Sequence, residues 1–478
     1  MPDQNSRMMQ AIYDTLFSAY TNPPEGTQGP ATSQADQTYL SLNWPGQQID
    51  ISQFANPFSP NNPDGSMEAV ENFSTLVDNL FSINPITSQN GNRLSLVYKS
   101  TVNAQVVPPP EDPKAKEAYE KAFDFLHTNG VTYNDEGKPV TVKVDSPIYS
   151  NYKRKLKAYN DAVVSLMSNY FQYDMSKPAD QRKWSLLGPT FQSAVKMAYE
   201  DLINAQKTKV EDMLAVLSQS SNNQVGVAFK QARETFDSYQ RAGLSDPNKV
   251  WYPTYALPAN WFAPGAAEEW TEVTINSKEI HTSEHSDFSK ISAGGKASWG
   301  LWNVGGSFDK EDSHQSMSSD TKNLKVSFKF CRIMIDRPWY NNLLYSMKGW
   351  NLGEQYGPGE LSNGTRVQEL NMPFPLLPTS FIAVRDLKIS ADFSHEDSSL
   401  IESKLSTSAS FGWGPFSISG SYATGSTDKK FNSKFDGSTI SNDGLQIIGW
   451  VNNIVPFAPP KPSSVNKEEK ASSSILEK

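Results

Sequence analysis

Apolar residues recur at helical spacing through the middle of the chain. Over 147–173 they step by three and four residues behind the capping residue Ser146 and Pro147, and a second stripe predicts a helix from about 189 to 217. Such stripes place apolar side chains on one helix face, which is typical of a helix bundle. Together with a helix from Pro113 and a hairpin over 131–144, they predict a helical module over residues 108–245.

The first 107 residues are polar and predict a region of mixed structure. Met8–Tyr20 and Met67–Phe81 carry apolar residues at helical spacing, whereas Leu94–Val107 has the composition of a strand. The segment 39–51 predicts two short strands broken at the turn signal Trp44-Pro45-Gly46.

The pattern changes near Trp251 from helical spacing to alternation. Residues 324–330, for example, place polar and apolar side chains in turn, as a half-buried strand requires. This predicts a β-rich domain over residues 246–458, and therefore an α+β fold for the whole chain. The charged, Ser-rich segment 459–478 predicts a disordered tail.

Within this β-rich domain a unit occurs twice. Ser289–Phe308 resembles Ser403–Tyr422 when residue 289 is set against residue 403, an offset of 114. Two short motifs match at its centre: Trp299-Gly300-Leu301-Trp302 and Trp413-Gly414-Pro415-Phe416. Glycine and proline mark turns, so each copy predicts a long β-hairpin with an aromatic tip. The repeats cover about 273–336 and 387–451.

The outer and inner parts of each predicted hairpin differ in composition. The outer arms are rich in β-formers, whereas the inner arms are dense in Ser, Gly and charged residues, as in Ser283–Asp287 and Ser394–Asp397. Such inner segments have weak intrinsic strand preference. We therefore expect that they can adopt different structures before and after some event.

The plan of four outer strands enclosing two long insertions resembles that of the perforin-like and cholesterol-dependent pore-forming proteins. The resemblance covers roughly residues 270–455. It implies that the insertions unfurl into transmembrane hairpins and that a ring of protomers forms a pore in which every backbone polar group is paired. The four glycines between the repeats, Gly349, Gly353, Gly357 and Gly359, do not reproduce the glycine-rich hinge of that family.

A second reading of the repeats stays open at this stage. Two related hairpins can form a twisted β-sandwich with Trp299 and Trp413 in symmetric core positions. In the membrane reading the same aromatic tips make contacts with a partner. The candidate contact residues are Trp299, Trp302, Trp413 and Phe416.

Charge, cysteine and histidine content and sequence motifs give no sign of a catalytic or metal site. The net charge is −9 with no long basic run, which argues against nucleic acid as a partner. Cys331 is the single cysteine and lies in an apolar strand, where it predicts buried packing. His281 and His285 are four residues apart, but no glutamate follows His281 directly, as it does in a zinc-protease helix. The sequence also contains no nucleophile elbow and no phosphate-binding loop. We therefore predict no catalytic, cofactor or metal site.

The leading functional hypothesis is a non-enzymatic assembly or binding protein, and its sharpest form is a toxin-like, membrane-inserting β-pore former. Its partners would be further copies of itself in a homo-oligomer, membrane lipid or a protein. The alternative is a structural or particle-associated protein, such as a shell, fibre or cargo. No secretory signal and no run of 18 apolar residues occurs. We expect synthesis as a soluble protein, either cytoplasmic or exported by a non-classical route.

Overall fold

The fold combines long antiparallel strands with a set of helices, so the predicted α+β class, with a helical module and a duplicated hairpin unit in a β-rich C-terminal part, is confirmed. It is known from a computed structural model. The structure describes residues 4–21, 37–59, 62–87, 89–106, 113–133, 138–170, 173, 178–218, 222–263, 270–277, 302–304, 322–367, 372–407, 410–422 and 429–461. The predicted disordered tail lies outside these residues apart from 459–461.

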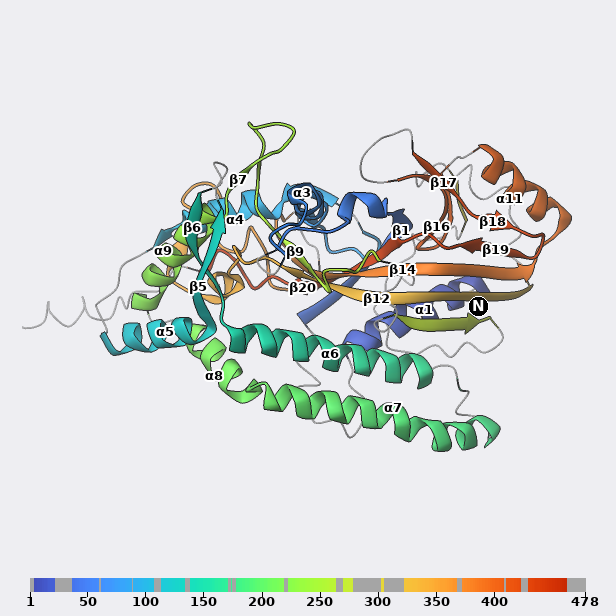
Figure 1. Ribbon diagram of the computed structural model, residues 1–478, viewed down its shortest axis with the longest axis horizontal. Coiled ribbons are helices and arrows are strands. Elements are labelled where there is room, and N and C mark those ends of the chain that lie inside the picture. Colours follow the sequence, from blue (N-terminus) through green and yellow to red (C-terminus); the bar gives the residue numbers. More distant parts are fainter. Residues whose placement is uncertain are drawn as a thin grey trace, which may run out of the picture.

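A large antiparallel sheet runs through the centre of the molecule (Figure 1). Its main strands, in spatial order, are β1 (Thr38–Gln48), β20 (Gln446–Ile454), β14 (Leu376–Asp392), β12 (Lys322–Asp336) and β10 (Thr271–Asn276). Alternating side chains of β12 and β14 enter two separate apolar cores, one on each face of the sheet. The half-buried strand predicted over 324–330 is confirmed, because its apolar side chains are buried and the polar ones between them are exposed or partly exposed, whereas the centre of β14 is buried on both faces.

Shorter strands extend this sheet at its edges. They are β2 (Asn79–Phe81), β3 (Gln89–Arg93), β9 (Tyr255–Leu257), β18 (Lys434–Phe435) and β19 (Thr439–Asn442). Among them, β19 pairs with the distal half of β14, where β20 no longer reaches.

The N-terminal region takes part in the same sheet. β1 pairs with β20 from Thr38–Asn453 to Gln48–Gln446, and α1 (Gln4–Thr21) packs into the core beside it. The predicted break at Trp44-Pro45-Gly46 lies inside one strand, as a register shift between Leu42 and Gln47. The expectation of two separate strands was wrong, because β20 pairs with β1 on both sides of the interruption.

The expected strand over Leu94–Val107 is also wrong. Its first part forms helix α4 (Leu94–Val102), and only Gln105–Val106 forms a short strand, β4, paired with β13 (Trp350–Asn351). The helix begins where Asp78 accepts hydrogen bonds from the backbone N–H and the hydroxyl of Ser95, at 2.8 and 2.7 Å. Asp78 follows α3 (Met67–Leu76), so the signal that starts α4 comes from another element.

The helical module begins with α5 (Pro113–Leu126), the hairpin β5–β6 (His127–Tyr133 and Pro139–Asp145) and α6 (Pro147–Tyr170). Ser146 caps α6 as predicted, since its hydroxyl accepts from the N–H of Tyr149 at 3.2 Å. The remaining helices are α7 (Pro178–Asn204), α8 (Lys207–Ser218) and α9 (Asn222–Ser238).

The helix predicted over 189–217 is two helices in the structure. α7 starts eleven residues before Pro189, which lies inside it, and the chain breaks at Gln206, whose φ of 63° ends the helical path before α8. The predicted start at 189 was wrong, because Pro189 lies in the interior of α7. The proline at the first position of α7 is Pro178, where its missing N–H and fixed φ suit a helix start.

The helices lie on different sides of the sheet. α6 and α7 run side by side along one face, whereas α5, α9 and the β5–β6 hairpin gather at one end (Figure 1). Buried aromatic residues such as Tyr98, Phe236 and Trp339 join these helices to the end of the sheet in one core.

At the opposite end a small second sheet packs beside helix α11 (His395–Thr407) (Figure 1). Its strands, in order, are β11 (Trp302–Val304), β15 (Phe411–Trp413), β16 (Phe416–Ser421) and β17 (Lys430–Asn432). This sheet contains the tip of the second predicted hairpin.

Candidate functional site

The second aromatic tip forms the turn that the sequence predicts. β15 and β16 pair antiparallel, with Trp413 opposite Phe416 and a turn at Gly414-Pro415 between them. The two rings stack with their centroids 6.1 Å apart. Gly414 has a φ of 54°, in the left-handed region that glycine adopts without strain.

The first tip is only partly described. Trp299, Gly300 and Leu301 lie outside the described residues, and Trp302 is described by its backbone at the start of β11. β11 pairs with β15, and Trp302 lies directly opposite Trp413. The structure therefore brings one arm of each hairpin into the same small sheet, a contact that the sequence did not predict.

The two copies share one strand register. In the first copy Val273 of β10 lies opposite Phe328 of β12. Adding the offset of 114 to both numbers gives Leu387 and Asn442, which lie opposite each other in β14 and β19. The next three pairs correspond in the same way: Thr274–Ser327 with Lys388–Ser441, Ile275–Val326 with Ile389–Ile440, and Asn276–Lys325 with Ser390–Thr439. The offset came from the tip sequences alone, so the outer strands support the duplication independently.

In the second copy, the pairs at the base and the two pairs next to the tip turn lie in one register. Counting 26 residues forward from Leu387 and 26 residues back from its partner Asn442 reaches Trp413 and Phe416, which are themselves paired. The Gly412–Ser417 and Trp413–Phe416 pairs therefore keep the register of the base, whereas a shift between Phe411 and Gly412 places Phe411 opposite Ser419, one residue out of that register. A one-residue slip between the base and the turn would move the side chains of one arm to the other face of the hairpin. The shared register therefore allows the apolar side chains of both arms to lie on one face.

Between base and tip the arm leaves the ladder. The first arm forms α11, which begins with a reciprocal cap: Ser394 and Asp397 exchange hydrogen bonds between side chain and backbone, at 3.0 and 3.4 Å. The tip is folded back onto the base of the hairpin. There the N–H of Ser417 donates to Oε1 of Gln446 at 2.7 Å.

The tip is fully buried in this form. Trp413 and Phe416 are both 0% exposed, so neither side chain is available to a partner molecule. They pack in one core with residues of α1 and β1. Their role as contact residues stays a prediction, and it requires a rearrangement that uncovers them.

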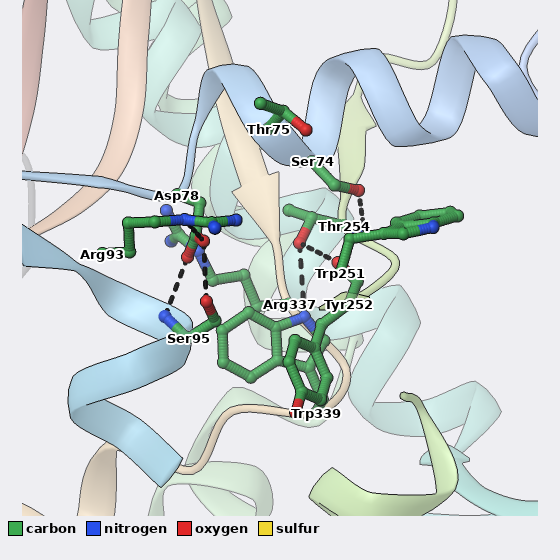
Figure 2. Close-up of a pocket in the computed structure, with 10 residues that line it drawn as sticks. All are labelled: Ser74, Thr75, Asp78, Arg93, Ser95, Trp251, Tyr252, Thr254, Arg337 and Trp339. Atoms are coloured by element: carbon green, nitrogen blue, oxygen red, sulfur yellow. Dashed lines mark hydrogen bonds and ion pairs between the residues drawn. The ribbon is translucent and has the colours of Figure 1, made fainter. Parts of the chain in front are cut away.

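A second candidate is a small polar cavity beside the start of α4 (Figure 2). It measures about 10 Å³, which is room for one water molecule. Asp78 accepts from Arg93 at 3.0 Å and from Ser95 on one side, and Thr254 accepts from the indole of Trp339 at 3.3 Å on the other.

Arg337 lies buried beside this cavity and donates to two backbone carbonyls, those of Pro378 at 2.6 Å and Val77 at 2.8 Å. Burial lowers its pKa to about 10. The guanidinium therefore ties α3, β12 and β14 together. The cavity is too small for an organic ligand, and its polar groups are engaged with one another, so it is a structural junction.

The third cluster joins the helical module to the sheet. Lys153 of α6 contacts Asp336 at the end of β12, at 2.9 Å, and also Asp145 at the end of β6. Burial opposes the charge of Lys153, yet the two carboxylates outweigh it and raise the pKa of the ammonium group. Burial also raises the pKa of Asp145. The arrangement pairs charges and has no nucleophile, so it anchors α6.

The described residues offer few other groups that could carry chemistry. No group of three or more His, Cys, Asp and Glu within that part of the chain is arranged to hold a metal ion. Cys331 is buried in β12, as its apolar surroundings predicted. His281 and His285 lie outside the described ranges, whereas His395 is exposed at the start of α11.

Within the described ranges, none of the helices combines the length and the apolar character needed to cross a bilayer.

Comparisons with known protein families, with curated proteins and with solved structures found no match to this chain. The function of this protein is therefore inferred from the geometry of its hairpins.

Proposed function

We propose that this protein is a non-enzymatic, self-assembling protein whose hairpin arms extend and insert into a membrane to form a pore. The observation that carries the proposal is the register shared by the base of the second hairpin and the two pairs next to its tip turn, with a helix between them. Extending both arms in this register would keep the pairs at the base and the Gly412–Ser417 and Trp413–Phe416 pairs, whereas the Phe411–Ser419 pair and the pairs between β16 and β17 would be replaced.

The sequence of the second arm supports an extended, membrane-facing state. From Ser403 to Trp413 the side chains alternate, with Leu405, Phe411 and Trp413 on one face and lysine, serine and glycine on the other. The returning arm repeats the pattern, with Phe416, Ile418 and Tyr422 against Ser417, Ser419 and Ser421. Strands that span membranes carry this dyad pattern, one face toward lipid and one toward water.

The length of the arm fits a bilayer. Ser403–Trp413 is eleven residues, and a tilted membrane-spanning strand needs about 9–11. A ladder running unbroken from Ser390 to Gly412 would place the tip roughly 70 Å beyond the sheet at about 3.3 Å per residue. The arm can therefore cross a membrane and still leave a stem between the bilayer and the folded body.

Helix α11 is compatible with both states. Ile401 and Leu405 are four residues apart, a spacing that places both side chains on one face of a helix and on one face of a strand. In the helix Ile401 is fully buried and Leu405 packs against the same core. The same apolar pair therefore stabilises the folded-back form and would face lipid in the extended form.

The test uses cysteine pairs that report the proposed ladder. In the extended hairpin Ser399 lies opposite Lys430, twelve residues inward from the Leu387–Asn442 pair, and both side chains are exposed in the folded-back form. Ser399→Cys/Lys430→Cys, made in a Cys331→Ala background, should form an intramolecular disulfide on dye-loaded liposomes under mild oxidation, above its level in solution. Mass spectrometry of peptides measures the cross-link, and dye release measures pore formation.

The matched control is Ser399→Cys/Lys429→Cys, which is one residue out of register and should not gain a cross-link on lipid. Ring-shaped oligomers imaged on the liposomes would support the proposal. Equal cross-linking of both pairs would contradict the register. If the protein releases no dye and forms no oligomers on any lipid composition, the proposed pore function is wrong. Ordered assemblies that form without lipid would instead favour a structural protein.

A further inference from the structure

A stretch of chain near the N-terminus packs over the aromatic tip of the second hairpin, whose Phe416 also packs on Phe328 of β12. This cover consists of α1 and β1, residues 4–48 apart from the undescribed segment 22–36. Met9 and Trp44 belong to the same core as Trp413 and Phe416, and Met9 is 0% exposed. We call these two elements the N-terminal cover.

Glycines bring the cover and the tip into very close contact. A Cβ placed on Gly414 would lie 2.7 Å from Sδ of Met9, and one placed on Gly412 would lie 2.7 Å from Cβ of Pro45. On the side of the cover, a Cβ on Gly46 would lie 2.5 Å from the carbonyl oxygen of Pro415. All three distances are shorter than real Cβ contacts, so Gly412 and Gly414 let the backbone of the tip lie against side chains of the cover, and Gly46 lets the backbone of the cover lie against that of the tip.

Hydrogen bonds make this contact specific. The hydroxyl of Ser417 donates to the carbonyl oxygen of Gly46 at 2.6 Å. Within the cover, the hydroxyl of Tyr13 donates to the carbonyl oxygen of Leu40 at 3.0 Å, which links α1 to β1. The cover therefore holds the tip as one connected unit.

We propose that the N-terminal cover is an autoinhibitory element, and that the second hairpin extends only after α1 and β1 have left the tip. This inference rests on the proposed membrane function, but the contact itself can be tested without lipid. The tip cannot move toward a membrane while Gly412, Gly414 and Ser417 stay against the cover. Release of the cover also frees the edge of β20, where β1 now pairs.

A reversible lock tests whether the cover must leave. Thr38 and Asn453 are direct cross-strand partners at the outer end of β1, and neither side chain is fully buried. The inner end of β1 continues into the buried residues Ile49 and Phe54, so a disulfide at Thr38→Cys/Asn453→Cys holds the strand at both ends. In a Cys331→Ala background, the oxidised protein should release liposome dye at least tenfold more slowly than the reduced protein.

A loosened cover tests the opposite direction. Met9→Ala removes the side chain that touches Gly414 and should accelerate hydrogen exchange of peptides within 411–421 at least tenfold. Met197→Ala is the matched control, because Met197 is 66% exposed on α7, far from the tip in the sequence. It should exchange like the wild type. Dye release should be faster for Met9→Ala and unchanged for Met197→Ala.

The outcomes separate the two proposals. If the oxidised lock releases dye as fast as the reduced protein, or if Met9→Ala leaves exchange of the tip unchanged, the autoinhibitory cover is wrong. If the wild type releases no dye from any liposome, the pore function fails, and the exchange experiment still decides whether the cover protects the tip.

Discussion

At the scale of single residues, ion pairs as well as apolar packing hold the helical module against the sheet. Lys153 lies between Asp145 and Asp336, which end two strands of different sheets. Two residues on, Lys155 pairs with Asp201 of α7 at 2.6 Å, in a more exposed position. The two lysines therefore present the same chemistry in different degrees of burial, which makes them a matched pair for mutation.

Lys153→Met should lower the free energy of unfolding by about 2 kcal/mol, between the ~1 kcal/mol of an exposed pair and the ~3–5 kcal/mol of a fully buried one. The physical reason is that two half-buried carboxylates lose their shared cation. Lys155→Met should cost less than about 1 kcal/mol. Urea unfolding of both variants measures the difference, and equal losses would contradict the anchoring role of Lys153.

At the scale of elements, α11 is the part of the second hairpin whose structure must change most under the proposed function. Ser399, Ser403 and Ser406 are exposed on this helix, so substitutions there alter its helix propensity without disturbing the core. Alanine favours a helix over serine by up to about 0.5 kcal/mol per residue. The helix and the extended arm therefore compete in a way that can be adjusted in small steps.

The triple variant Ser399→Ala/Ser403→Ala/Ser406→Ala should slow dye release by up to about tenfold, because roughly 1.5 kcal/mol is added to the cost of unwinding α11. Ser185→Ala/Ser193→Ala is the control, since both serines are exposed on α7 outside the hairpins. Faster release by the triple variant, or the same slowing in the control, would argue against unwinding of α11 before insertion.

At the scale of the whole molecule, the stability of the fold should depend on pH through a histidine at the junction of the helical module. Burial lowers the pKa of His127 to about 4, and the neighbouring Lys153 and Lys143 act in the same direction. Its Nδ1 lies 3.1 Å from the carbonyl oxygen of Phe123, and Asp124 partly offsets the effect of the lysines.

A histidine in the unfolded chain has a pKa of about 6.5. Between pH 6.5 and 4, His127 therefore binds a proton in the unfolded chain but stays neutral in the folded protein. The free energy of unfolding should therefore fall as the pH falls through this window, by about 2 kcal/mol at pH 5 relative to pH 7. Urea unfolding at both pH values measures this loss. His127→Gln should reduce it, whereas His395→Gln, on the exposed start of α11, should leave it as in the wild type.

The sequence by itself determined the features that depend on local pattern. The stripe behind Ser146 and Pro147 predicted α6, because capping and periodicity act within one segment. The matched tips at Trp299 and Trp413 predicted an offset of 114, and the outer strands pair with that offset because duplicated sequences carry the same alternation.

Only the tertiary structure decided the features that depend on distant partners. α4 replaced an expected strand because Asp78, in another element, caps its start. The tip at Trp413 is covered because Met9 and Trp44, roughly 400 and 370 residues earlier, reach it through close glycine contacts. Neither contact can be predicted from the spacing of apolar residues in the sequence, because each depends on which elements lie next to one another in the fold.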